Sequence, residues 1–180
     1  MQLQGHKSFS CRRDELWRRL TDLGFLVGCL PDVARVEEVT PTSARAVLRP
    51  GFSFVRGELH LTLERQPDPA PGTAAYLVQT KGVGSSTAVL ATFRLAEPAG
   101  EDPSPGGPGE GCLLQWSAEI RELGGVLKAV PRSLVQAGAM KVVSDLLAGI
   151  ERQLASPSAT PLPPPGGPQG GAPQPPAGGP

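Results

Sequence analysis

The stretch that decides the fold is residues 112–154, CLLQWSAEIRELGGVLKAVPRSLVQAGAMKVVSDLLAGIERQL. Its first part alternates apolar and polar residues, as a strand with one buried face does. The predicted inward set is Cys112, Leu114, Trp116, Ala118 and Ile120. From Val126 the apolar residues follow a helical stripe instead. The stripe consists of Leu127, Val130, Leu134, Val142, Leu146, Ile150 and Leu154. A last strand followed by one long helix is therefore predicted, and about 25 helical residues span about 38 Å, enough to cross a sheet.

The residues before this stretch predict one strand, two short helices and five further strands. Apolar residues at helical spacing indicate a first helix after Asp14, and Pro31 stops a second helix over 23–30. The strands are expected over residues 3–10, 33–39, 43–48, 52–64, 74–82 and 85–97. Such a run of strands with the helices kept apart is typical of the α+β class. We expect a curved antiparallel sheet of about seven strands around the long C-terminal helix.

Domain organisation follows from composition. Residues 1–154 form the predicted folded domain, and residues 155–180 are almost entirely proline, glycine and small residues. Such a segment buries too little apolar surface to offset its chain entropy, so a disordered tail is predicted. Residues 96–111 have a similar composition and are expected to form a long loop between two strands.

Several segments carry a resemblance to a known family. They are DELWRRLTD (14–22), CLPDV (29–33), FSFVRGELHLTLE (52–64), KGVG (81–84) and ELGGVLKAVPRSLVQAGAMKVVSDLL (122–147). In their order and spacing they resemble the bacterial carbon monoxide dehydrogenase G-subunit family, within the START/Bet v 1-like (SRPBCC) superfamily, over about residues 1–154. The family usually has Pro-Gly where this chain has Pro31-Asp32. Glycine permits a positive φ, which aspartate adopts less readily.

The resemblance implies a helix-grip fold with an apolar internal cavity between sheet and long helix. It also implies a non-enzymatic accessory protein that supports maturation or membrane recruitment of a molybdenum hydroxylase of the carbon monoxide dehydrogenase type. A quinone or lipid is the expected occupant of the cavity, with no cofactor. Two alternatives stay open: a small enzyme of the cyclase or dehydratase kind, and a ligand-free interaction scaffold.

Composition and cysteine spacing exclude other classes. Basic and acidic residues balance at 17 each, which argues against nucleic-acid binding. Three widely separated cysteines give neither a metal-binding spacing nor a disulfide framework, so Cys29 is interpreted as part of a structural corner before Pro31. The N-terminal residues contain no apolar signal core, so a cytoplasmic protein is expected. Any peripheral contact with the inner membrane face is expected through residues 25–27 or through a partner.

Candidate site residues follow from the strand and helix phases. The apolar cavity candidates are Trp17, Phe25, Leu26, Leu30, Leu59, Leu61, Trp116, Leu134 and Val142. Arg56 interrupts an apolar run and is the candidate polar anchor at the pocket edge. His6, His60, Glu119 and Glu122 fall on the polar phase of their strands, so no catalytic pair is predicted.

Overall fold

A single antiparallel sheet organises the molecule. The computed structural model describes residues 1–51, 57–82, 84–96 and 111–155. The strands are β1 (Gln2–Phe9), β2 (Val33–Val39), β3 (Ser43–Leu48), β4 (Leu59–Ala70), β5 (Thr73–Gly82), β6 (Ser85–Ala96) and β7 (Cys112–Gly125). The helices are α1 (Arg13–Thr21), α2 (Leu23–Cys29), the 3₁₀ turn η1 (Val126–Ala129) and α3 (Arg132–Ala155). The seven strands lie in the order β1-β7-β6-β5-β4-β3-β2.

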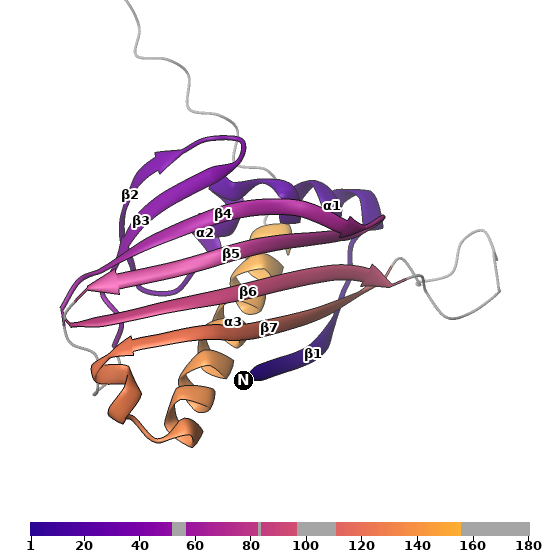
Figure 1. Ribbon diagram of the computed structural model, residues 1–180. Helices are drawn as coiled ribbons and strands as arrows, with labels where there is room; N and C mark the ends of the chain where they lie inside the picture. The colour runs from indigo at the N-terminus through magenta and orange to yellow at the C-terminus, as the bar shows by residue number, and fades with distance from the viewer. Residues whose placement is uncertain (52–56, 83, 97–110, 156–180) are drawn as a thin grey trace, which may run out of the picture.

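The order of the strands in the sheet determines where the helices lie. Strands β2 to β7 pair with their sequence neighbours, whereas β1 pairs with β7, so the first strand completes the sheet beside the last. The chain leaves β1 into α1 and α2, re-enters at the opposite edge through β2, and returns by hairpins to β7. Helix α3 then runs across the concave face of the sheet (Figure 1). This arrangement confirms the predicted α+β class and the helix-grip arrangement.

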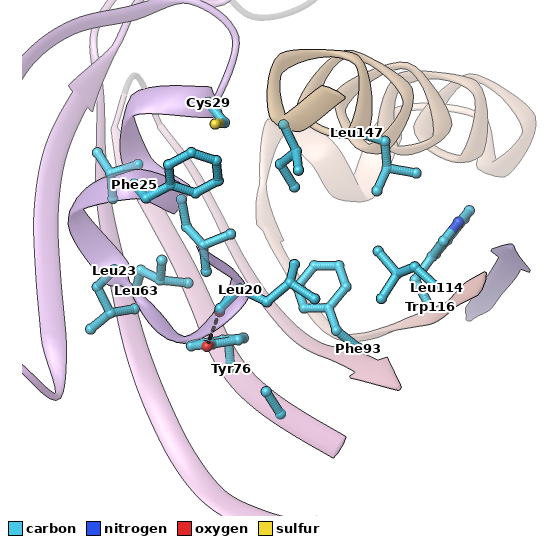
Figure 2. Packing of buried hydrophobic residues seen from close by; sticks show 14 of the residues in the cluster. Leu20, Leu23, Phe25, Cys29, Leu63, Tyr76, Phe93, Leu114, Trp116 and Leu147 are labelled. Carbon is cyan, nitrogen blue, oxygen red and sulfur yellow. Dashed lines mark hydrogen bonds between the residues drawn. The ribbon is translucent and has the colours of Figure 1, made fainter. Parts of the chain in front are cut away.

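The buried side of the sheet matches the predicted phases. The inward set of β7, from Cys112 to Ile120, is buried, and so are Leu61 and Leu63 of β4. Tyr76 on β5 is almost fully buried, and its hydroxyl donates a hydrogen bond of 2.5 Å to the carbonyl of Leu20 at the end of α1 (Figure 2). This bond joins the first helix to the middle of the sheet.

The segment from α2 to β2 is the predicted structural corner. The Asp22 carboxylate accepts a hydrogen bond of 3.1 Å from the Phe25 amide and so caps α2. After Cys29 the chain turns through Pro31 and Asp32, and Asp32 has a positive φ of 60°. Its carbonyl accepts a 2.8 Å hydrogen bond from the Arg49 amide at the end of β3. Aspartate thus adopts a left-handed backbone conformation that glycine adopts without strain.

The buried stripe of the long helix differs from the predicted one near its start. Residues Val126–Ala129 form a separate 3₁₀ turn, and α3 begins at Arg132, directly after Pro131. With 3.6 residues per turn, a step of seven returns to within about 20° of the same direction, whereas a step of eight departs by about 80°. Counting back from Val142, the residue on the inner stripe is therefore Val135, which is buried, and Leu134 is half exposed. The prediction of Leu134 as an inward residue is wrong for this reason.

Two sequence predictions lie outside the described residues. Helix α3 ends at Ala155, and residues 156–180 are not described, so the predicted tail over 155–180 stays a prediction. The same holds for most of the predicted loop over 96–111.

Candidate functional site

A cavity of about 280 Å³ lies between α3 and the concave face of the sheet. Its volume is near the lower end of the range of small-molecule sites, about 300–1,000 Å³. The helix side is formed by Val135, Gly138, Ala139, Val142, Val143 and Leu146. None of these side chains carries a polar atom, so the helix contributes only apolar surface.

The sheet side of the cavity comes from the inward residues of β4 to β7. Leu61, Val78, Val89, Phe93 and Ile120 are among them, and Trp116 adds its indole. Figure 2 shows Trp116 and Phe93 extending from the sheet into the space below α3. The corner after α2 and the end of β3 close one side with Leu30, Pro31 and Leu48. The lining is thus largely apolar on every side.

Few polar side chains interrupt this lining. Thr80 and Thr87 face the cavity from β5 and β6, and their hydroxyl oxygens are 2.8 Å apart. The Ser85 hydroxyl donates a 2.8 Å hydrogen bond to the Gly82 carbonyl. Asp32 is the sole ionisable side chain among the described lining residues, and it lies at the corner. The site is suited to an apolar molecule with a small polar group.

The structure places five of the predicted cavity residues in the lining. They are Leu30, Leu59, Leu61, Trp116 and Val142. Trp17, Phe25 and Leu26 belong instead to the packed core around α1 and α2, outside the lining. Leu134 also lies outside the lining, and Arg56 falls outside the described residues. Their roles in binding a ligand stay predictions.

The burial of α2 rules out one predicted surface. Phe25, Leu26 and Val27 are at most 9% exposed, because they pack between α1, α3 and the sheet. Apolar side chains inside the core do not reach a bilayer in this conformation. Membrane contact through residues 25–27 is therefore wrong for the folded protein.

Sequence reasoning missed the paired threonines and part of the helix lining. Thr80 and Thr87 lie within strands whose sequences show weak alternation, AAYLVQTKG and SSTAVLATFRLAE. The pairing of the two strands through the short turn at Gly82 and Gly84 was the available signal. It puts Thr80 opposite Thr87 in the register. Val135 was missed because the predicted stripe joined Leu134 to Val142 by a step of eight residues, and Val143 because the stripe was drawn only one residue wide.

The titratable groups outside the cavity lining are mainly at the surface. His6, His60, Glu119 and Glu122 are at least partly exposed, as their strand phases predict. Burial raises the pKa of the Cys29 thiol to about 11. No group of three or more histidine, cysteine, aspartate or glutamate side chains is placed to hold a metal ion within the described part of the chain. Cys29 is itself part of the buried core cluster.

Another hollow lies on the convex face of the sheet. It has a volume of about 530 Å³ and is lined by outward-facing side chains that include His6, Arg94 and Gln115. These residues share one cross-strand row on β1, β7 and β6. It is a surface depression over the sheet, whereas the cavity under α3 lies between two layers.

Helix α3 is also long and apolar. By length and composition it is the one described helix able to cross a membrane. A helix that covers an apolar core passes the same test. In α3 only Val135, Leu147, Gly149 and Ile150 are buried, because the cavity replaces part of the packing beneath it.

Comparison with solved structures shows the same fold in other proteins. A conserved protein from Geobacillus kaustophilus is 19% identical with a TM-score of 0.72, over 86% of this chain and 95% of that one. A protein from Thermus thermophilus is 16% identical with a TM-score of 0.62, over 87% of this chain and 100% of that one. A START superfamily protein from Mycobacterium smegmatis is 14% identical with a TM-score of 0.61, over 84% and 95%.

The family comparison covers nearly all of the described chain. No functionally curated protein matches the sequence. The model of the family described as the G subunit of carbon monoxide dehydrogenase (CoxG) matches residues 5–155, from β1 to the end of α3. The matched region contains every element that forms the cavity. The chain therefore belongs to the carbon monoxide dehydrogenase G-subunit (CoxG) family, built on the START-like helix-grip fold.

Proposed function

We propose that this protein is a non-enzymatic carrier that holds an apolar, lipid- or quinone-like molecule in the cavity under α3. The observation that carries the proposal is the lining, which is apolar on the helix side and nearly so on the sheet side. Each 100 Å² of apolar ligand surface removed from water contributes about 2.5 kcal/mol before the costs of association. The proposal includes an accessory role at a carbon monoxide dehydrogenase-type molybdenum hydroxylase, which the description of the family supports.

The lining supports a carrier over an enzyme. General acid–base chemistry needs a titratable group within hydrogen-bond reach of the reacting atoms, usually with a partner that tunes its pKa. Among the described lining residues Asp32 is the sole ionisable group, and its carboxylate faces the amide of Gly51 at 3.4 Å. A molecule bound here is therefore held and shielded from water.

Uptake can be measured through the two tryptophans. Trp116 lines the cavity, whereas Trp17 packs against the core outside it. Added short-chain quinone should quench the emission of wild type and of Trp17→Phe, and should leave the emission of Trp116→Phe nearly unchanged. Equal quenching of both variants would mean that the quinone binds elsewhere.

The natural occupant is tested by extraction. Protein purified from its native host without detergent is extracted with organic solvent and analysed by mass spectrometry, beside a denatured and washed control. A stoichiometric quinone or lipid supports the carrier. An empty extract together with no uptake of added quinone would favour the ligand-free scaffold.

We further propose that exchange with the membrane occurs at residues 126–135, which form η1 and the first turn of α3. Val126 and Leu134 in this segment are 51% and 50% exposed. Lys128 and Arg132 lie beside them in the chain and are also exposed. Apolar side chains flanked by cations are suited to the inner membrane face, because that leaflet is anionic. Leu127 and Val135 of the same segment line the cavity, which connects the surface to the site.

Vesicle binding tests this surface. We expect Val126→Ser with Leu134→Ser to reduce co-sedimentation with phosphatidylglycerol vesicles several-fold. Val36→Ser is the matched control, because Val36 is 49% exposed on β2 at the sheet edge. A similar loss in the control would contradict the assignment of the surface.

The role at the molybdenum hydroxylase has its own test. Quinone-loaded protein is mixed with a purified carbon monoxide dehydrogenase of this type and carbon monoxide, and quinone reduction is followed by absorbance. Faster reduction of carried quinone than of the same amount of free quinone is expected. Equal rates of reduction would contradict the proposed delivery of quinone to the enzyme.

A further inference from the structure

The hydroxyls of the paired threonines can form hydrogen bonds with a ligand, which the apolar side chains of the lining cannot. We propose that the hydroxyls of Thr80 and Thr87 bind a carbonyl oxygen at the polar end of the ligand. This inference rests on the proposed carrier function and names the chemical class that the carrier holds: an apolar molecule that ends in a ketone, ester or quinone carbonyl.

The two threonines form one row of the sheet floor. They are register partners on β5 and β6, and their Oγ1 atoms are 2.8 Å apart. The same row continues to Leu61 on β4 and to Leu123 on β7. All four residues line the cavity. The hydroxyl pair is thus an isolated polar point with apolar neighbours on both sides.

One hydroxyl proton of the threonine pair is left without an acceptor. Each threonine hydroxyl carries one proton, and one of the two protons is used in the bond between them. The second proton has no hydrogen-bond acceptor among the described residues. Both threonines are half-buried, so water in an empty cavity can accept this proton, and a ligand that displaces the water must supply an acceptor in its place. The pair therefore needs an acceptor, which an occupant of the cavity can provide.

The other polar lining groups do not offer this donor. The proton of Ser85 is donated to the Gly82 carbonyl at 2.8 Å. Ser117 follows the inward Trp116 on β7, so strand alternation directs its side chain to the opposite face. The carboxylate of Asp32 is an acceptor when ionised. Within the described lining, the free hydroxyl donor thus belongs to the threonine pair.

A carbonyl is the group that matches one free donor. Its oxygen only accepts hydrogen bonds, so it can accept one from the free hydroxyl of the pair. A carbonyl also has no donor of its own that would be left unpaired. A net hydrogen bond of this kind changes affinity by about 2- to 12-fold. The apolar remainder of the ligand would lie toward Val89, Ile120 and Trp116, which line the floor beyond the pair.

The experiment compares matched probes on matched variants. The probes are 2-undecanone, 2-undecanol and undecane, and affinity is measured by displacement of a fluorescent apolar dye. The double variant Thr80→Val, Thr87→Val removes both hydroxyls at similar volume. Thr92→Val is the control, because Thr92 lies on β6 but faces the convex side. The ratio of variant to wild-type affinity is taken for each probe, which cancels differences in solubility.

We expect the double variant to bind 2-undecanone about 2- to 12-fold more weakly and undecane equally well or better. Each single valine variant leaves one hydroxyl with a free proton, so its loss should be smaller. The double serine variant restores both hydroxyls and should recover affinity for the ketone even if the valine variant folds poorly.

Three results would overturn the inference. An equal change for ketone and alkane would remove the role of the hydroxyls while leaving the carrier function intact. A larger loss for 2-undecanol than for 2-undecanone would assign the pair to an alcohol rather than a carbonyl. Failure of wild type to bind any of the probes or added quinone would overturn the carrier function and the inference together.

Discussion

The indole of Trp116 occupies the space that a side chain at Gly5 would need. The two residues are register partners on β7 and β1. A Cβ atom at Gly5 would lie 2.7 Å from Cζ2 and 3.0 Å from Nε1 of the indole. A glycine on the edge strand therefore sets the position of the tryptophan that lines the cavity.

Substitution of this glycine tests the relationship. Gly5→Ala should displace the indole of Trp116 and lower the free energy of unfolding by about 1 kcal/mol, because overpacking outweighs the lower chain entropy of alanine. It should also shift the tryptophan emission and weaken quinone uptake. Urea unfolding and fluorescence measure both effects. In the control Gly111→Ala, the new Cβ would lie at an ordinary 3.6 Å from the Phe9 carbonyl oxygen, so little change is expected.

The crossing of α2 and α3 depends on Gly149. A Cβ at this position would lie 2.6 Å from the carbonyl oxygen of Cys29, a backbone atom that cannot rotate away. We expect Gly149→Ala to cost about 2 kcal/mol of unfolding free energy despite the higher helix propensity of alanine. Gly28→Ala is the matched change on the other helix, where the nearest atom is 3.9 Å away. It should be neutral or stabilising, and equal effects of the two changes in thermal unfolding would contradict the packing.

Asp32 adopts a left-handed backbone conformation that glycine adopts without strain. Its φ is 60°, and among the described residues it is the sole non-glycine with a positive φ. Asp32→Gly should raise the free energy of unfolding by up to about 1 kcal/mol, and Asp32→Ala should lower it. A melting experiment on the two variants decides the sign. The corner would be unstrained if both variants melted below wild type.

The buried thiol of Cys29 makes the fold sensitive to alkali. Burial raises its pKa from the ordinary value of 9.0 to about 11. The folded chain thus keeps a proton that the unfolded chain releases above pH 9, and rising pH draws the equilibrium toward the unfolded state. This contribution to stability is complete below pH 9 and is lost as pH rises toward 11. The urea midpoint should fall across that range, less steeply in Cys29→Ala. Parallel curves for the two proteins would show that other groups are responsible.

The neighbouring thiols of Cys11 and Cys112 should react slowly in the folded protein. Their sulfur atoms are 3.6 Å apart, and both residues are free thiols. Burial, with the hydrogen bond to Cys112, raises the pKa of Cys11 from 9.0 to about 12. The reactive thiolate is correspondingly rare at neutral pH. We expect labelling by an aromatic disulfide reagent to be slow at pH 7 and to become about tenfold faster for each pH unit. Urea-unfolded protein should label at once. Rapid labelling of the native protein would contradict this.

The fold was predictable where side-chain periodicity reports burial directly. The alternation of Leu61 and Leu63 with polar neighbours, and that of Leu114 and Trp116, fixed which face of β4 and β7 is buried. The switch to helical spacing located α3. These signals are strong because each strand has one apolar and one polar face.

The details of the cavity were less predictable, because they depend on the exact phase of the helix and on how strands pair. Leu134 and Val135 are neighbouring apolar residues, and Val135 faces inward because it lies seven residues before Val142, whereas Leu134 lies eight before it. The hydroxyl pair arises from the register of β5 and β6, which a single strand sequence does not contain. Strand β4 also continues past the predicted end at residue 64, through Pro67 and Pro69 to Ala70.

The hollow beneath α3 has a consequence for the lifetime of the protein. A helix held by few buried side chains opens locally at a lower free energy than the sheet, so its amides should exchange with deuterium first. An occupant that binds only the closed form suppresses this opening in proportion to its concentration over its Kd. Cleavage by a protease follows the population of the open form. Empty copies should therefore be degraded faster than loaded ones, which would match the amount of carrier in the cell to the supply of its cargo.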